Sequence, residues 1–452
     1  MIGLEAWLVG GVFFLVLGLV ARLAARGITD VITMTALSFA LFYGFRTILL
    51  VAGLDLPSPS YLFPSATLSA DLTRALVGAS LFLLALGAGI YATTGPNARG
   101  FAPFFVTGRP SPQRQVHAVV FFTVCSALIS AWLLARFGSP GALISAIKFD
   151  KALAGLYVFR VFPAVGSMLA AGAFVDLWRL PGRRPAAALC LLCAAFNGWS
   201  VFLWGSRSLI VVTIVVIVIG LARKSGRMRP GHTLRGVVAV VVASLLVLAV
   251  AGALRVGRDT LTHGETQDAF ANASTWRQAS LATNSVYLDA AVLAFRDVPD
   301  VFPARAGTDF ANGVLGVVPG VIWADKPRNI AAGSWFRQQY QPKIVNGWPM
   351  GAPALWYLNF SWLGVLLGGL VSGLAIGMIS ARQRRVADSG HNTACAAVAG
   401  IFVVGLGLDN QTPIYSVIWL VPLWFVALYL RSDTAVHPGA SAAVPSVPDH
   451  AE

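Results

Sequence analysis

Residues 358–377, LNFSWLGVLLGGLVSGLAIG, carry no charged side chain and are long enough to cross a bilayer as a helix. Small residues recur in this stretch at four-residue spacing: Gly364, Gly368, Gly369, Gly373 and Gly377. Such spacing brings glycines onto one helix face, where a neighbouring helix can approach closely. The stretch therefore predicts a membrane-spanning helix that packs against another helix of the same chain or, alternatively, against a second copy.

The rest of the chain has the same apolar character. Of its 452 residues, 57% are hydrophobic and only 12% are charged, which is too apolar a composition for a soluble domain. We predict an all-α polytopic membrane protein with about eleven transmembrane helices. They are expected near residues 3–23, 29–53, 70–93, 116–136, 160–178, 186–204, 208–222, 235–254, 353–380, 393–409 and 413–430.

Basic residues cluster in the loops that follow every second predicted span. These residues are Arg22 and Arg26; Arg99, Arg109 and Arg114; Arg179, Arg183 and Arg184; Arg223, Lys224, Arg227, Arg229 and Arg235; and Arg382, Arg384 and Arg385. The positive-inside rule places their shared side in the cytoplasm, with the N-terminus outside and the C-terminus cytoplasmic. Because topology accounts for most of the net charge of +14, the charge does not indicate a nucleic-acid partner.

Four regions follow from this reading. Residues 1–254 form a transmembrane bundle of eight spans, and residues 353–430 form a second bundle of three spans. Between them, residues 255–352 are a large external loop domain, which is expected to be folded because its charges are nearly balanced and it is rich in Trp, Tyr, Pro and Gly. Residues 431–452 are rich in Ala, Pro and Ser and predict a disordered cytoplasmic tail.

Metal chemistry finds no support in the sequence. The four cysteines all fall within predicted spans, where thiols usually serve as small packing residues: Cys125, Cys190, Cys193 and Cys395. Since no set of metal ligands accompanies them, we predict no metal and no cofactor.

Arginines recur near the external boundary of the predicted bundle. They are Arg46, Arg136, Arg160, Arg207, Arg255 and Arg258. Snorkelling to lipid headgroups explains any one of them. Arg207 fits that explanation least well, because it lies in a tight Gly-Ser turn between two apolar runs and could offer two parallel hydrogen bonds to a phosphate. Together the arginines indicate a ligand that is both anionic and lipidic, such as a polyprenyl pyrophosphate carrying sugars.

The external loop contains groups suited to the sugar part of such a ligand. Its aromatic residues suit sugar rings, and they suit an interfacial aromatic belt equally well: Trp276, Trp323, Trp335, Tyr340, Trp348, Trp356 and Tyr357. Its basic residues concentrate in one stretch that holds Lys326, Arg328, Arg337 and Lys343. Glycosyl transfer also needs a base for the acceptor hydroxyl, and His263, Asp259, Glu265, Asp289 and Asp325 are candidates.

The chain resembles the Wzy-type O-antigen polymerases, the oligosaccharide repeat-unit polymerases of bacterial envelopes. The likeness is carried by GSRS at 205–208, by VVPGVIWADKP at 317–327, by GAPALWYLNFSWLGVLLGGLVSG at 351–373, and by the one large external loop between late spans. It covers about residues 200–375. Arg207 matches the arginine of the family, whereas Lys326, Arg328 and Arg337 match only its basic loop.

This resemblance implies a GT-C-like membrane fold in the bacterial plasma (inner) membrane. The implied activity is metal-independent polymerisation of undecaprenyl-pyrophosphate-linked oligosaccharides on the outer face. Arg207 and His263 are then candidate catalytic residues. Arg46, Arg136, Arg160, Arg255, Arg258, Lys326, Arg328 and Arg337 are candidate substrate-binding residues. Membrane lipids, a flippase and a chain-length regulator are the implied partners.

Three alternatives stay open at the level of sequence. An O-antigen ligase-like transferase would move glycan to a different acceptor and would need a histidine in the large loop, for which His263 is the candidate. A transporter of lipid-linked glycan would show matching broken helices or internal repeats. A scaffold for envelope enzymes would need none of the arginines.

Overall fold

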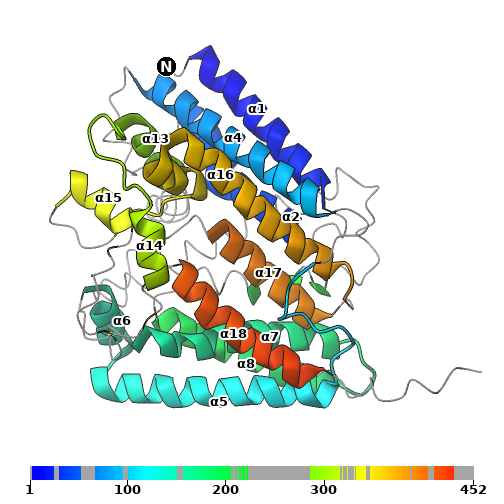
Figure 1. The fold of residues 1–452 in the computed structure, drawn as a ribbon. Helices are drawn as coiled ribbons and strands as arrows, with labels where there is room; N and C mark the ends of the chain where they lie inside the picture. Colours follow the sequence, from blue (N-terminus) through cyan, green and yellow to red (C-terminus); the bar gives the residue numbers. More distant parts are fainter. Residues whose placement is uncertain are drawn as a thin grey trace, which may run out of the picture.

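Helices make up all regular structure in the described part of the chain (Figure 1). The computed structural model describes residues 3–24, 30–51, 67–94, 100–149, 156–204, 286–315, 332–342, 347–386, 389–405 and 412–431, with short pieces between 210 and 221 and single positions at 318, 323 and 330. The helices are α1 (Leu4–Arg22), α2 (Val31–Phe39), the π-helix η2 (Ala40–Gly44), α3 (Phe45–Val51), α4 (Leu68–Thr93), α5 (Pro112–Phe137), α6 (Pro140–Phe149), the 3₁₀-helix η5 (Leu156–Arg160), α7 (Val161–Leu177), α8 (Arg184–Leu203), α13 (Val286–Asp297), α14 (Thr308–Leu315), α15 (Ala332–Tyr340), α16 (Ala352–Gln383), α17 (Gly390–Gly405) and α18 (Thr412–Leu430).

Seven helical segments of the described residues are long and apolar enough to cross a membrane. They are Leu4–Arg22, Val31–Val51, Leu68–Thr93, Pro112–Phe137, Val158–Leu177, Arg184–Leu203 and Ala352–Gln383. The chain is therefore a helical membrane protein with several spans, as its composition predicts.

The other four predicted spans are covered less completely. About half of 208–222 and all of 235–254 lie outside the described residues. The predicted span 393–409 corresponds to α17, which has 16 residues, and 413–430 corresponds to α18, which has 19.

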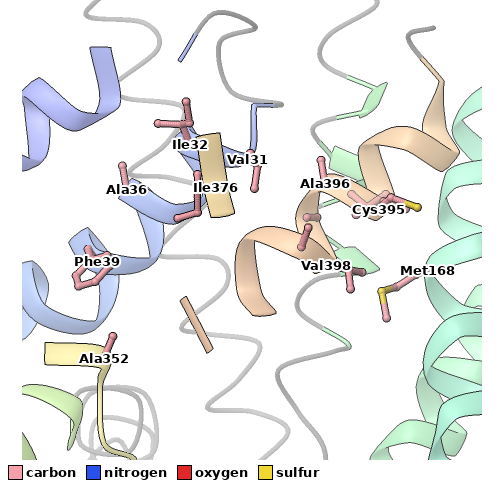
Figure 2. Close-up of a cluster of buried hydrophobic side chains, with 14 of the residues drawn as sticks. Val31, Ile32, Ala36, Phe39, Met168, Ala352, Ile376, Cys395, Ala396 and Val398 are labelled. Carbon is pink, nitrogen blue, oxygen red and sulfur yellow. The ribbon is translucent and has the colours of Figure 1, made fainter. Parts of the chain in front are cut away.

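The helices form two packed groups that α17 connects. In one group α4 packs along α16, with α1 and α13 against α4; in the other group α7 packs on α8 and α5. Because α17 contacts both α7 and α2, it lies between the groups. Figure 2 shows Ala396 and Val398 of α17 between the apolar side chains of α2 and Met168 of α7.

The glycines of the opening stretch bring the backbones of α4 and α16 together. A Cβ built on Gly373 would lie 2.1 Å from the carbonyl oxygen of Leu86, and one built on Gly369 would lie 2.4 Å from that of Phe82. The predicted close approach is confirmed, and the partner is a helix of the same chain. Gly368 has another role. It leaves room for the ring of Trp356, which belongs to the first part of α16.

We expect Gly373→Ala to destabilise the protein by about 1–3 kcal/mol, because the added methyl group meets rigid backbone and forces α4 away from α16. The matched control is Gly18→Ala in α1, where no atom lies within 4 Å of the added Cβ. Thermal unfolding in detergent measures both variants. Equal unfolding midpoints for the two variants would show that the α4–α16 interface accommodates the added methyl group without loss of stability.

Helix ends with basic residues gather at one end of the bundle. The Arg384 guanidinium donates to the carbonyl oxygens of Thr94 and Leu23, so the ends of α16, α4 and α1 meet. Arg114 at the start of α5 donates to the carbonyl oxygens of Tyr429 and Arg431 at the end of α18. The ends of α1, α4, α16 and α18 lie on the right in Figure 1, so these basic segments share an end of the bundle, as their alternation predicts. That this end is cytoplasmic stays a prediction.

Helix α13 is the unexpected element, because it belongs to the stretch expected to form an external loop domain. Its residues from Leu288 to Phe295 are fully buried. Phe295 packs against the rings of Tyr357 and Trp362 and fills the space beside Gly78 of α4. This part of the loop thus packs among the spans, while the division of the chain at 254 and 352 stays a prediction.

Candidate functional site

The three loop helices α13, α14 and α15 lie near the starts of α4 and α16, on the left in Figure 1, opposite the basic helix ends. Charged and aromatic side chains from these five helices form networks at this end.

Asp297 ties the end of α13 to α15. Its carboxylate accepts hydrogen bonds of 2.7 and 2.8 Å from Nε and Nη2 of Arg296, and a third from the Tyr340 hydroxyl. The hydrogen bond to Asp297 raises the pKa of Arg296. Burial, followed by the hydrogen bond to Asp297, raises the pKa of Tyr340, so this phenol stays a neutral donor. The Arg296–Asp297 pair and the Tyr340 hydroxyl therefore hold one another in a fixed, charge-assisted arrangement.

The first turns of α4 bring two more charged groups to the same place. Asp71 interacts electrostatically with Arg296, and its Oδ2 atom is buried with no hydrogen-bond partner in the described part of the chain. One turn later, Arg74 donates to the Tyr357 hydroxyl at 3.3 Å, and that hydroxyl donates to the carbonyl oxygen of Val298 at 2.9 Å. Residues of α4, α13, α15 and α16 therefore meet around Arg296.

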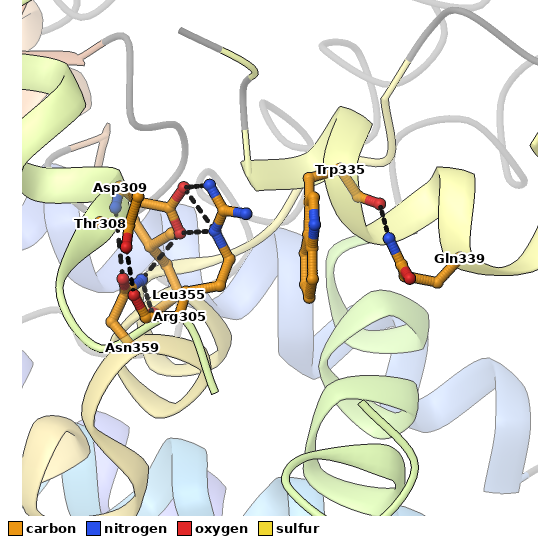
Figure 3. Close-up of polar contacts among 7 residues, drawn as sticks. All are labelled: Arg305, Thr308, Asp309, Trp335, Gln339, Leu355 and Asn359. Carbon is orange, nitrogen blue, oxygen red and sulfur yellow. Dashed lines mark hydrogen bonds and ion pairs between the residues drawn. The ribbon is translucent and has the colours of Figure 1, made fainter. Parts of the chain in front are cut away.

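A second network joins α14 to α16 (Figure 3). The buried carboxylate of Asp309 accepts from Nε of Arg305 at 2.9 Å and from Nδ2 of Asn359 at 2.9 Å. The Arg305 guanidinium carbon also lies 4.6 Å from the ring centroid of Trp335, where the ring face attracts a cation. Trp335 thereby joins α15 to the same network.

This network lies at a break in α16. Phe360 and Ser361 leave helical geometry, and Ser361 has φ 55° and ψ −149°, a conformation that L-residues rarely adopt. Backbone carbonyls freed at the break need other donors. The carbonyl oxygen of Leu358 accepts from the backbone N–H of Arg305, and that of Leu355 accepts from Nδ2 of Asn359. The segment before α14 therefore stabilises a discontinuous helix.

Arg46, a predicted substrate-binding residue, lies inside the bundle in contact with α13. Its Nε and Nη2 atoms donate to the carboxylate of Asp289 at 2.9 and 2.8 Å, and both side chains are fully buried. Its third nitrogen, Nη1, is buried without a hydrogen-bond partner among the described residues. Most of the donor capacity of Arg46 thus goes to a structural ion pair, and its role toward substrate stays a prediction.

The other three described arginines of the prediction have different surroundings. Arg136 is exposed on α5, with its guanidinium carbon 5.8 Å from the ring of Trp132, as expected for a side chain at a lipid interface. Arg160 is half-buried at the end of η5. Arg337 of α15 donates to Gln341 at 2.9 Å and lies 5.7 Å from the ring of Trp348.

The remaining predicted site residues lie outside the described residues: Arg207, His263, Arg255, Arg258, Lys326 and Arg328. Their roles stay predictions. Among the described residues, no three His, Cys, Asp or Glu side chains are grouped so that they could hold a metal ion. The predicted independence of metals and cofactors also stays a prediction.

Sequence reasoning missed the residues that the structure brings together most closely. Asp71 and Arg74 lie at the start of the predicted span 70–93, where they are not candidates for the site. Asp297, Arg305 and Asp309 contribute to the sequence analysis only through the charge balance of the large loop. A usable signal was the presence of Asp71 and Arg74 one turn apart on a helix that is otherwise apolar.

Comparison of the chain with protein-family models, with curated proteins and with solved structures found no match.

Proposed function

We propose that this protein is a metal-independent membrane glycosyltransferase that polymerises undecaprenyl-pyrophosphate-linked oligosaccharide repeat units on the outer face of the bacterial plasma membrane. The proposal includes about eleven spans and a GT-C-like organisation. It rests on the Ser-Arg segment at 205–208 and on the large loop between late predicted spans. The structural observation that supports it is the gathering of arginine, carboxylate and aromatic side chains at the end of the bundle opposite the basic helix ends.

These side chains match the needs of glycosyl transfer. Arginines suit a diphosphate, because the guanidinium group can donate two parallel hydrogen bonds to phosphate oxygens. Half-buried aromatic rings such as Trp335 offer flat surfaces to sugar rings. A carboxylate with a free oxygen can accept the proton of an acceptor hydroxyl. All three groups are present around α13, α15 and the starts of α4 and α16.

The broken helix α16 favours one competing function, the transport of lipid-linked glycan. Transporters commonly place their substrate sites at discontinuous helices. A ligase-like transfer to another acceptor is the second alternative, and it predicts that His263→Ala stops transfer.

Purified protein in detergent is expected to lengthen lipid-linked repeat units into a ladder of polymers, with no gradient present. A gel of the released glycans shows the ladder, and deletion of the gene in the cell is expected to leave single-unit surface glycan. If detergent samples never lengthen the glycan while reconstituted vesicles move it across their bilayer, the protein is a transporter. A ladder that His263→Ala leaves unchanged would argue against the ligase mechanism.

A further inference from the structure

Asp71 differs from the neighbouring carboxylates in its hydrogen bonding. Asp297 is occupied by Arg296 and Tyr340, Asp309 by Arg305 and Asn359, and Asp289 by Arg46. Asp71, in contrast, has a buried Oδ2 atom that accepts no hydrogen bond in the described part of the chain. A buried carboxylate oxygen without a donor is unfavourable, so it needs a water molecule or a ligand hydroxyl as its partner.

A helix N-terminus and a guanidinium group surround the Asp71 carboxylate. The side chain lies in the first turn of α4, where the helix dipole favours negative charge. Arg296 interacts electrostatically with Asp71, but its guanidinium group forms its ion pair with Asp297, and Asp71 is in no ion pair with another described residue. The Arg296 side chain is 22% exposed, so this place borders the surface of the described structure.

Side chains suited to sugars and to phosphates are also close. The Tyr340 ring lies 5.4 Å from that of Trp348, and the Tyr340 hydroxyl joins this aromatic pair to Asp297. Arg74 adds a second guanidinium group one helical turn from Asp71, positioned by the Tyr357 hydroxyl. A carboxylate, two guanidinium groups and aromatic rings thus meet at one place, contributed by four helices.

We propose that Asp71 is the general base that binds and deprotonates the acceptor hydroxyl of a lipid-linked saccharide. This inference rests on the proposed function. The acceptor O–H proton passes to the Asp71 carboxylate while the acceptor oxygen forms a bond to the anomeric carbon of the donor sugar. The bond between that carbon and the diphosphate oxygen breaks, and its electron pair leaves with the lipid diphosphate. Asp71 is a catalytic residue in this step, and Asp297 and Tyr340 position Arg296 beside it.

The test is the elongation assay in detergent, with defined lipid-linked repeat units as substrate. We expect Asp71→Asn to lower kcat about 100-fold and to change KM little, because the amide still binds the hydroxyl but takes no proton. Folding should be retained, since the Oδ2 atom accepts no hydrogen bond from any residue that the structure describes. The matched control is Asp300→Asn, on an exposed carboxylate just beyond α13, which should behave as wild type.

A second variant tests the base without relying on the amide. In Asp71→Ala, added formate should restore part of kcat by supplying a carboxylate at the vacant position. A folded Asp71→Asn protein with wild-type kcat, or an Asp71→Ala protein that formate does not rescue, would overturn the inference and leave polymerisation standing. If the wild-type protein itself forms no polymer, the proposed function is wrong, and the role of Asp71 as general base is then wrong as well.

Discussion

Replacing Arg46 by methionine is expected to destabilise the protein by about 3–5 kcal/mol, because the substitution leaves the Asp289 carboxylate charged and unpaired in the interior. Both side chains of this pair are 0% exposed, so water cannot replace the lost partner. Asp289 lies on α13, and its unpaired charge would push that helix out of its site among the spans. We therefore expect a lower unfolding midpoint and easier proteolysis of α13.

A double-variant cycle separates the charge effect from packing. Asp289→Leu alone should be as harmful as Arg46→Met, whereas Arg46→Met combined with Asp289→Leu should recover most of the lost stability, since two apolar side chains leave no charge behind. Arg136→Met is the control, because that arginine is exposed. Additive losses in the double variant would contradict the ion-pair account. If the double variant folds, its elongation rate then reports on the predicted contact of Arg46 with substrate.

Replacing Arg207 by alanine is expected to abolish or shorten the polymer while the protein still inserts in the membrane. A guanidinium in the turn between two apolar runs can hold a phosphate through two parallel hydrogen bonds, and alanine offers none. Arg207→Lys should retain only part of the activity, because an ammonium group keeps the charge but lacks the planar pair of donors. Lipid-linked repeat units should accumulate in both variants.

Surface polysaccharide from cells that carry each Arg207 variant shows the outcome on a gel, with membrane content measured by immunoblot. Polymers of normal length in both variants would remove Arg207 from the site. They would also favour the scaffold alternative, in which the chain only recruits other enzymes.

Local sequence patterns predict the helices of this protein well, because each span must satisfy its own backbone in lipid. The runs that became α1, α4, α5, α7, α8 and α16 are apparent from composition alone. Glycine spacing also predicted the close approach in α16 correctly, since the period of a helix decides which residues share a face. The identity of its partner, α4, needed the structure.

Contacts between distant residues could not be predicted in this way. Asp289 was considered only as a candidate base, although it pairs with Arg46 across 243 residues of sequence. The run VYLDAAVLAF at 286–295 is too short for a span, so its apolar character alone does not predict burial among the spans. Charge pairing and burial of α13 depend on the packing of α3, α4 and α16 around it, which no local pattern contains.

The Arg46–Asp289 pair also constrains how the nascent chain is assembled. Arg46 enters the bilayer long before the ribosome makes its counter-ion, and 243 residues correspond to roughly 12–50 s of synthesis at about 5–20 residues per second. During that interval the guanidinium group needs water, lipid headgroups or the insertion machinery as a temporary partner. The second predicted span is therefore expected to settle in its final position only after translation has passed α13.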